Sequence, residues 1–217
     1  RAIRRSGIIA IKLRDDDALV GASLLEGGEV MLGTRLGRAI RFEDGQIRPT
    51  SRYSMGVRGI RLDKGDEVIS LLTLEEGAQV LGVTELGYGK RSDPALYRMT
   101  NRGGKGIKAM NLTKKTGPLA ALLMVRDDED VMLITDEGII IRIDVGKIRE
   151  TGRSAQGVRL MKVAKDSRIV DVARAEPELP EGAENPDPDG AEGERSFEPE
   201  GAARPGVNNG DMPGNDI

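Results

Sequence analysis

The sequence predicts an all-β fold that is assembled from repeated small antiparallel sheets, and two observations support this prediction. The pattern Val-x3-Thr-x2-Gly-x3-Arg occurs three times, with its glycines at positions 37, 87 and 138. An internal repeat of this length makes each copy one supersecondary unit. No segment shows the sustained apolar period of an amphipathic helix. We therefore expect a β repeat protein.

Each copy of the repeat is typical of a β-hairpin. In the first copy we expect strands over residues 29–34 and 38–42, joined by a turn that ends at Gly37. Gly87 and Gly138 close the same turn, because a residue without a Cβ can adopt positive φ. Every hairpin also ends on an arginine, which hints at a basic surface.

A second, glycine-rich segment follows each hairpin. The copies are Gly56-Val57-Arg58-Gly59-Ile60, Gly103-Gly104-Lys105-Gly106-Ile107 and Gly157-Val158-Arg159-Leu160, with an incomplete early copy at Gly7-Ile8-Ile9-Ala10-Ile11. Each is expected to lead into a strand, a turn and a further strand, such as residues 67–72 in the first copy. About four strands in each unit match a propeller blade.

The predicted units lie near residues 1–28, 29–78, 79–129 and 130–175, which makes about three and a half four-stranded blades. A propeller usually needs about 4 to 8 blades to close. We therefore expect the domain formed by residues 1–175 to continue upstream of the first residue.

The charge of the chain is divided between two regions. Residues 176–217 hold 12 acids and 2 bases, whereas residues 1–175 hold 24 acids and 31 bases. The tail also contains 7 of the 10 prolines and little apolar periodicity, which is typical of a disordered segment. It is either a solvating tail or a regulatory one. The basic remainder suggests a partner that is a polyanion.

Composition excludes several functions. The chain has no Cys, His or Trp, so disulfides, thiol catalysis, Cys/His zinc sites and Ser-His triads are ruled out. The acidic runs at 15–17 and 127–130 lack the spacing of a calcium loop and are expected to be solvated turns. We expect no catalytic residue, no metal site and no cofactor in this chain. No apolar run reaches the roughly 18 residues of a membrane span, and we expect a cytoplasmic location.

The loops that connect hairpin and second segment carry the candidate site. They measure 19 residues in the first and third copies (37 to 56 and 138 to 157), but 16 in the second (87 to 103). The second contains Arg102-Gly103-Gly104-Lys105-Gly106, in which glycines expose backbone N–H groups and bases neutralise phosphate. Such a turn in isolation is more often structural, but here bases recur in the other units.

If the units surround an axis, these bases form one rim that can bend duplex DNA through its phosphates without reading bases. The candidate DNA-binding residues are Arg38, Arg41, Arg52, Arg58, Lys90, Arg91, Arg98, Arg102, Gly103, Gly104, Lys105, Gly106, Lys108, Arg142, Arg149, Arg153 and Arg159. With only three tyrosines, stacking on single strands is not expected.

Several segments in order resemble the C-terminal domain of the DNA gyrase A protein. They are Gly87-Tyr88-Gly89-Lys90-Arg91, Tyr97-Arg98, Arg102-Gly103-Gly104-Lys105-Gly106, Gly56-Val57-Arg58-Gly59-Ile60-Arg61-Leu62, Gly65-Asp66-Glu67-Val68 and Leu133-Ile134-Thr135-Asp136. The resemblance covers roughly residues 1–175, and the acidic tail is also typical of the family.

The resemblance implies a β-pinwheel, a relative of the propeller in which neighbouring blades exchange strands. It further implies that the chain wraps duplex DNA so that an ATP-dependent type II topoisomerase can introduce negative supercoils on the chromosome. The implied partners are duplex DNA, the rest of the gyrase A protein and the gyrase B protein, which is the ATPase, in an A2B2 assembly. ATP and Mg²⁺ are then used elsewhere in the holoenzyme. Thr100 and Asn101 stand where the family's principal box has Gln and a base, so that box is expected in an upstream blade.

Three alternatives stay open at the level of sequence. One is the corresponding domain of topoisomerase IV, a decatenase, whose box is usually eroded. A second is a propeller-like scaffold for protein interactions, whose binding would be insensitive to salt. The third, a propeller enzyme, lacks any plausible catalytic site in this sequence.

Overall fold

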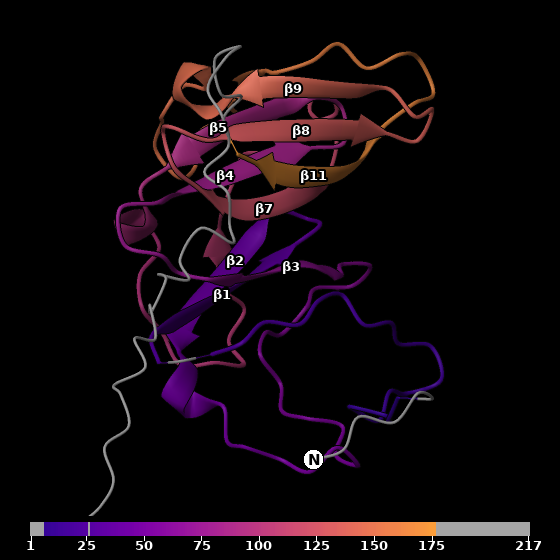
Figure 1. Ribbon diagram of the computed structural model, residues 1–217, viewed down its shortest axis with the longest axis vertical. Coiled ribbons are helices and arrows are strands. Elements are labelled where there is room, and N and C mark those ends of the chain that lie inside the picture. The colour runs from indigo at the N-terminus through magenta and orange to yellow at the C-terminus, as the bar shows by residue number, and fades with distance from the viewer. Residues whose placement is uncertain (1–6, 26, 177–217) are drawn as a thin grey trace, which may run out of the picture. The chain divides into compact units, whose positions relative to one another are not determined.

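The computed structural model describes residues 7–25 and 27–176, and the predicted acidic tail lies outside these residues apart from Glu176. The described residues form an all-β, propeller-like fold with three antiparallel sheets (Figure 1). Its elements in chain order are β1 (Glu29–Thr34), β2 (Arg38–Glu43), η1 (Asp44–Gln46), β3 (Val68–Thr73), β4 (Gln79–Thr84), β5 (Tyr88–Ser92), η2 (Pro94–Leu96), β6 (Ile107–Lys108), β7 (Leu119–Val125), β8 (Asp130–Thr135), β9 (Ile140–Asp144), η3 (Val145–Lys147), β10 (Val158–Arg159) and β11 (Ile169–Ala175).

Each sheet contains one repeat hairpin, and two sheets receive a strand from the next unit. The strand orders are β3-β1-β2-β6 in the first sheet, β10-β5-β4-β7 in the second sheet and β11-β8-β9 in the third sheet. The short strands β6 and β10 pair with β2 and β5 of the preceding unit. Neighbouring units therefore exchange strands, as the family resemblance implied.

The first two predicted strands agree with β1 and β2 to within one residue, and the third is shifted by one residue. The expectation of a strand after each glycine-rich segment was wrong for the two earliest copies. Residues 7–25 and 56–60 contain no strand. The physical reason is that β6 and β10 form only by pairing with the sheet before them, and no described sheet precedes the first sheet.

All four residues of the repeat have a structural role, beginning with the valine. Val80 packs between the first and second sheets, and Val131 packs between the second and third sheets. Because side chains alternate along a strand, the next residues, Met31 and Leu81, face the following sheet and enter the same two clusters. Two of the three apolar clusters therefore lie between successive sheets, and the third, with Val30 and Phe42, belongs to the first unit alone.

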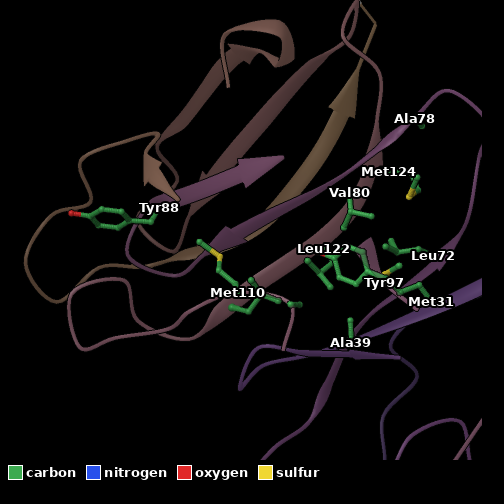
Figure 2. Close-up of a cluster of buried hydrophobic side chains, with 12 residues drawn as sticks. Met31, Ala39, Leu72, Ala78, Val80, Tyr88, Tyr97, Met110, Leu122 and Met124 are labelled. Atoms are coloured by element: carbon green, nitrogen blue, oxygen red, sulfur yellow. The ribbon is translucent and has the colours of Figure 1, made fainter. Parts of the chain in front are cut away.

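Figure 2 shows the core cluster between the first and second sheets, in which Met31 and Leu72 point toward Tyr97 and Leu122, while Tyr88 lies apart from them. Burying several such side chains, each worth about 1.5–3 kcal/mol, holds the two sheets together.

The threonine and the glycine of the repeat form the turn. The Oγ1 of Thr34 accepts a hydrogen bond from the Arg38 amide at 3.2 Å, and Thr84 and Thr135 accept the equivalent bonds at 3.1 Å. The three turn glycines have φ of 80°, 81° and 80°, as predicted.

Candidate nucleic-acid interface

The arginine of the repeat joins one unit to the next. Arg41 donates from Nη1 to the carbonyl oxygens of Pro94 (2.7 Å) and Tyr97 (3.2 Å) in the next unit, and it pairs with Glu29. Arg91 repeats this arrangement, since its Nε donates to the carbonyl of Ile148 at 2.7 Å.

The charge of Arg91 is also balanced, because the guanidinium is ion-paired with Asp127 and bonded to the side chain of Gln79. Arg142 pairs with Asp130 and donates to the carbonyl of Glu176. Bases at this position therefore act within the chain.

Lys90 is a further predicted base whose side chain is bonded within the chain, and it is buried. Its residue exposure is 2%, and its Nζ donates to Ser92 Oγ (2.9 Å) and to the carbonyls of Gly152 (3.0 Å) and Arg153 (2.5 Å). Burial, and secondarily the charge of Arg153, lowers the pKa of Lys90 to about 8. The side chains of Lys90, Arg41, Arg91 and Arg142 are therefore engaged in contacts within the chain.

The structure also corrects the register of the second unit. Gly106, and not Gly103, is the equivalent of Gly56 and Gly157. Ile107 and Lys108 pair with Ala39 and Arg38 of the first sheet, in the same way that Val158 and Arg159 pair with Gly89 and Tyr88 of the second sheet. All three loops thus span 19 residues (37 to 56, 87 to 106 and 138 to 157).

With this register, bases recur in all three units at four further offsets from the hairpin glycine, besides the offset of Arg41, Arg91 and Arg142. The first row is Arg48, Arg98 and Arg149; the second row is Arg52, Arg102 and Arg153; the third row is Arg58, Lys108 and Arg159; the fourth row is Lys64, Lys114 and Lys165. Arg48 and the whole fourth row were not predicted from the sequence as DNA-binding residues. The signal that would have found them is their fixed offset of 11 and 27 residues from the glycines (37 to 48 and 37 to 64).

Two arginines of the second row donate hydrogen bonds to the backbone of the third-row base in the preceding unit. Arg102 Nη1 donates to the carbonyl of Arg58 at 2.9 Å, and Arg153 donates in the same way to the carbonyl of Lys108. Arg102 Nε also donates to the carbonyl of Gln46 at 2.9 Å. Arg52, in the first unit, instead donates to the Tyr53 hydroxyl at 2.8 Å. Arg102 and Arg153 thus bring the bases of successive units together.

The glycines of the second-unit loop dock it on the first unit. The Gly103 amide donates to the carbonyl of Gly59, and the carbonyl of Gly104 accepts from the amide of Arg61 at 2.8 Å. A Cβ on Gly106 would lie 2.5 Å from the carbonyl oxygen of Ala39. These glycines therefore permit close contact between backbones, and Lys105 beside them is exposed.

Asp63 holds two bases side by side. Its carboxylate accepts from Lys105 Nζ at 3.0 Å and from Arg38 Nε at 2.9 Å. Lys105, and to a smaller degree Arg38, holds the pKa of Asp63 below its ordinary value. Arg38 also lies directly opposite Lys108 in the pairing of β2 with β6, so Lys108 neighbours one of the two bases that Asp63 holds.

Tyr88 has a similar place in the next sheet, opposite Arg159. Arg159 donates to the Tyr88 hydroxyl at 3.0 Å, and the charged groups of Arg159 and Lys115 each lie 5.5 Å from the ring centroid. The hydrogen bond from Arg159 lowers the pKa of the Tyr88 hydroxyl below its ordinary value.

These contacts join bases of all three units into a feature that we call the basic strip. Its members are Arg38, Arg58, Arg102, Lys105, Lys108, Arg153 and Arg159. In the part of the chain that the structure describes, Arg58 and Lys108 have side chains that make no hydrogen bond or ion pair. Free cations at repeated positions can neutralise the phosphates of a nucleic acid.

Two negative findings apply to residues 7–25 and 27–176. No group of three or more acidic side chains in these ranges is arranged to hold a metal ion. None of their helices is long and apolar enough to cross a membrane.

Sheets that exchange strands and carry a repeated row of bases define a propeller-like repeat domain with a cationic surface. The family model for the DNA gyrase C-terminal domain, beta-propeller, matches residues 1–26, 28–75, 78–126 and 129–176. The chain therefore belongs to this family.

Relatives and solved structures agree with this assignment. The DNA gyrase A protein of Pseudomonas aeruginosa is 40% identical over 204 residues, or 90% of this chain and 22% of that protein. The DNA gyrase A protein of Staphylococcus aureus is 41% identical over 218 residues, or 99% of this chain and 24% of that protein. The chain thus spans about a quarter of the length of the curated relatives it matches.

The solved structure of a DNA gyrase A C-terminal domain superposes with a TM-score of 0.73 and 28% identity over 79% of this chain and 59% of that one. The C-terminal domain of DNA topoisomerase IV shares the fold, with a TM-score of 0.76 and 24% identity over 81% of this chain and 56% of that one.

Proposed function

We propose that this chain binds duplex DNA along the basic strip through phosphate contacts and bends or wraps the duplex. The observation that carries the proposal is the third row, because Arg58, Lys108 and Arg159 have the same offset in three consecutive units, and Lys108 and Arg159 lie at equivalent positions of exchanged strands. A duplex presents phosphates at regular intervals, so equivalent bases on successive units can engage successive parts of one backbone.

Recognition of this kind does not read sequence, because phosphate contacts fix the position of the duplex and carry no base information. Two of the three tyrosines also favour a duplex over a single strand. Tyr97 is buried, and the ring of Tyr88 packs under Arg159, so neither is placed to stack on unpaired bases.

In the larger protein, we infer that this module serves an ATP-dependent type II topoisomerase that introduces negative supercoils. Its partners would be the rest of the gyrase A protein and the ATPase, gyrase B, in an A2B2 assembly, acting on the chromosome in the cytoplasm. ATP and Mg²⁺ would be held elsewhere in that assembly. The support is the family membership and about 40% identity to DNA gyrase A proteins.

The proposal is tested by titrating salt in a binding assay of the 217-residue chain with random-sequence duplex DNA. The logarithm of the affinity should fall linearly with the logarithm of the salt concentration, with a slope of about −0.9 for each neutralised phosphate. We expect several phosphates in total and equal affinity for unrelated sequences. A slope near zero would overturn the proposal and favour a scaffold that binds proteins.

A further inference from the structure

One position of the repeat differs in chemistry among the three units. The residue three positions after the hairpin glycine is Ile40 in the first unit, Lys90 in the second and Ile141 in the third. The position lies on the second hairpin strand, and in the first two sheets that strand adjoins the next unit's loop. An ammonium group therefore replaces an aliphatic side chain at a buried junction between units, which is costly unless the charge has partners.

Lys90 has a full set of partners. An ammonium group has three N–H donors, and those of Lys90 reach Ser92 Oγ and the carbonyl oxygens of Gly152 and Arg153. Two of these three acceptors belong to the loop of the third unit, which carries the second-row Arg153. Lys90 therefore binds the backbone of a member of the basic strip.

Backbone hydrogen bonds to neighbouring segments hold that loop on both sides of Gly152 and Arg153, since beyond them the Asn111 amide donates to the carbonyl of Ala155 at 3.2 Å. The Arg91 amide donates to the carbonyl of Arg149 at 3.1 Å, and the Thr151 amide donates to the carbonyl of Arg91 at 2.9 Å. Between them, the carbonyl of Gly152 accepts from the Ala155 amide as well as from Lys90, whereas the carbonyl of Arg153 accepts from the Lys90 side chain.

At the junction between the first two units, a different residue binds the backbone of the equivalent arginine, Arg102. There, the backbone amide and Nε of Arg102 donate to the side chain and the carbonyl of Gln46, both at 2.9 Å. The residue equivalent to Gln46 at the next junction is Leu96, whose side chain cannot accept a hydrogen bond. Lys90 appears where the glutamine is missing.

We propose that Lys90 is a positioning residue that holds the backbone of Arg153 in the basic strip, in place of the glutamine that holds Arg102. This inference rests on the proposed binding of DNA. The geometry couples the two residues, because the same Arg153 guanidinium also holds the carbonyl of Lys108. Loss of the ammonium group should loosen residues 152–154 and misplace Arg153, while the sheets stay packed.

The test uses Lys90→Met in the 217-residue chain, with Ile40→Met as the matched control at the equivalent position. Lys90→Met should fold, since the other units have an aliphatic residue there. Amide hydrogen exchange over residues 152–154 should accelerate at least tenfold. The affinity for duplex DNA should fall about threefold to tenfold, and the salt slope should decrease by about one phosphate. Ile40→Met should change neither property.

A double-mutant cycle with Arg153→Ala distinguishes positioning from a general loss of structure. Lys90→Met should weaken binding little further once Arg153 has been removed. An equal loss in both backgrounds, or unchanged exchange over residues 152–154, would overturn the inference. If Lys90→Met does not fold, Lys90→Gln keeps an amide donor and should give an intermediate exchange rate and affinity, whereas wild-type values would contradict the proposal.

Failure of the proposed function can be distinguished from failure of the inference about Lys90. If the wild-type chain shows no salt-dependent binding of DNA, the proposed function fails, and with it any role of Lys90 in DNA binding. In that case the exchange measurement alone decides whether Lys90 fixes the loop.

Discussion

Lys90 illustrates how burial changes the behaviour of a single charge. Its ammonium group is surrounded by Ser92, two backbone carbonyls and the positive charge of Arg153, and burial lowers its pKa to about 8. Burial raises the pKa of Tyr97, whose hydroxyl is hydrogen-bonded to Ser92, to about 12, so Tyr97 stays neutral at the pH values at which Lys90 titrates. Between about pH 8 and the ordinary lysine pKa of 10.5, the folded chain therefore loses a proton that the unfolded chain keeps.

This difference predicts the sign of a pH effect on stability. When the unfolded state binds more protons, the free energy of unfolding rises with pH, by at most about 1.4 kcal/mol per pH unit for one group. Relative to Lys90→Met, the wild-type chain should therefore gain stability between pH 8 and 10. Urea unfolding of both proteins at pH 7.5, 8.5 and 9.5 measures the difference, and a constant difference would show that the pKa of Lys90 is not lowered.

At the level of single residues, the sequence identified the bases but not the direction in which they point. Arg41 and Arg58 both follow a repeated glycine, yet the first binds carbonyls of the next unit and the second is exposed. Which arginine is hydrogen-bonded within the chain depends on where the next unit places its carbonyl groups. That placement is a property of the tertiary structure. Patterns along the chain cannot reveal it.

The short exchanged strands β6 and β10 depend on the glycine that precedes each of them. A Cβ on Gly106 or Gly157 would lie 2.5 Å from a carbonyl oxygen of the preceding sheet, and both residues have positive φ, 67° and 81°. These glycines therefore combine two requirements, an unusual backbone conformation and a close contact. Gly138 shares the positive φ of 80° but has no atom near its Cβ position.

We expect Gly106→Ala and Gly157→Ala to destabilise the fold by roughly 2–4 kcal/mol, because the clash adds to a conformational cost of about 1–2 kcal/mol. Gly138→Ala should show only the conformational cost. Gly45→Ala, with no positive φ and no neighbouring atom, should be nearly neutral. Denaturant midpoints of the four variants test this order, and a Gly106→Ala variant as stable as Gly45→Ala would contradict the assigned contact.

At the level of elements, the repeat made the hairpins predictable, because its valine, threonine and glycine fix a core position, a turn cap and a positive φ. The exchange of strands between units was harder to predict from the sequence. Assigning Gly103 as the second glycine followed local composition, whereas pairing with Ala39 and Arg38 selects Gly106. A two-residue strand has too little sequence pattern of its own, and its register is set by the sheet that receives it.

At the scale of the whole molecule, the three units repeat a surface as well as a fold. The exchanged strands β6 and β10 bring Lys108 and Arg159 to equivalent places, and Arg58 has the same offset from its hairpin glycine, so the three bases should contribute similarly to the binding of a continuous phosphate backbone. Successive third-row bases belong to different units and make no direct contact with one another in the described residues, so their contributions should add.

We therefore predict that Arg58→Ala, Lys108→Ala and Arg159→Ala each reduce the slope of the salt dependence by about 0.9, and that the triple variant reduces it by about 2.7. The affinity should fall equally for unrelated duplex sequences, because the lost contacts are to phosphates. The matched control replaces Arg126, Lys147 and Arg168, which pair with Glu75, Asp144 and Asp136 outside the basic strip. Because this control removes the same charge, an equal loss of slope in both triple variants would mean that overall charge, and not the strip, governs binding.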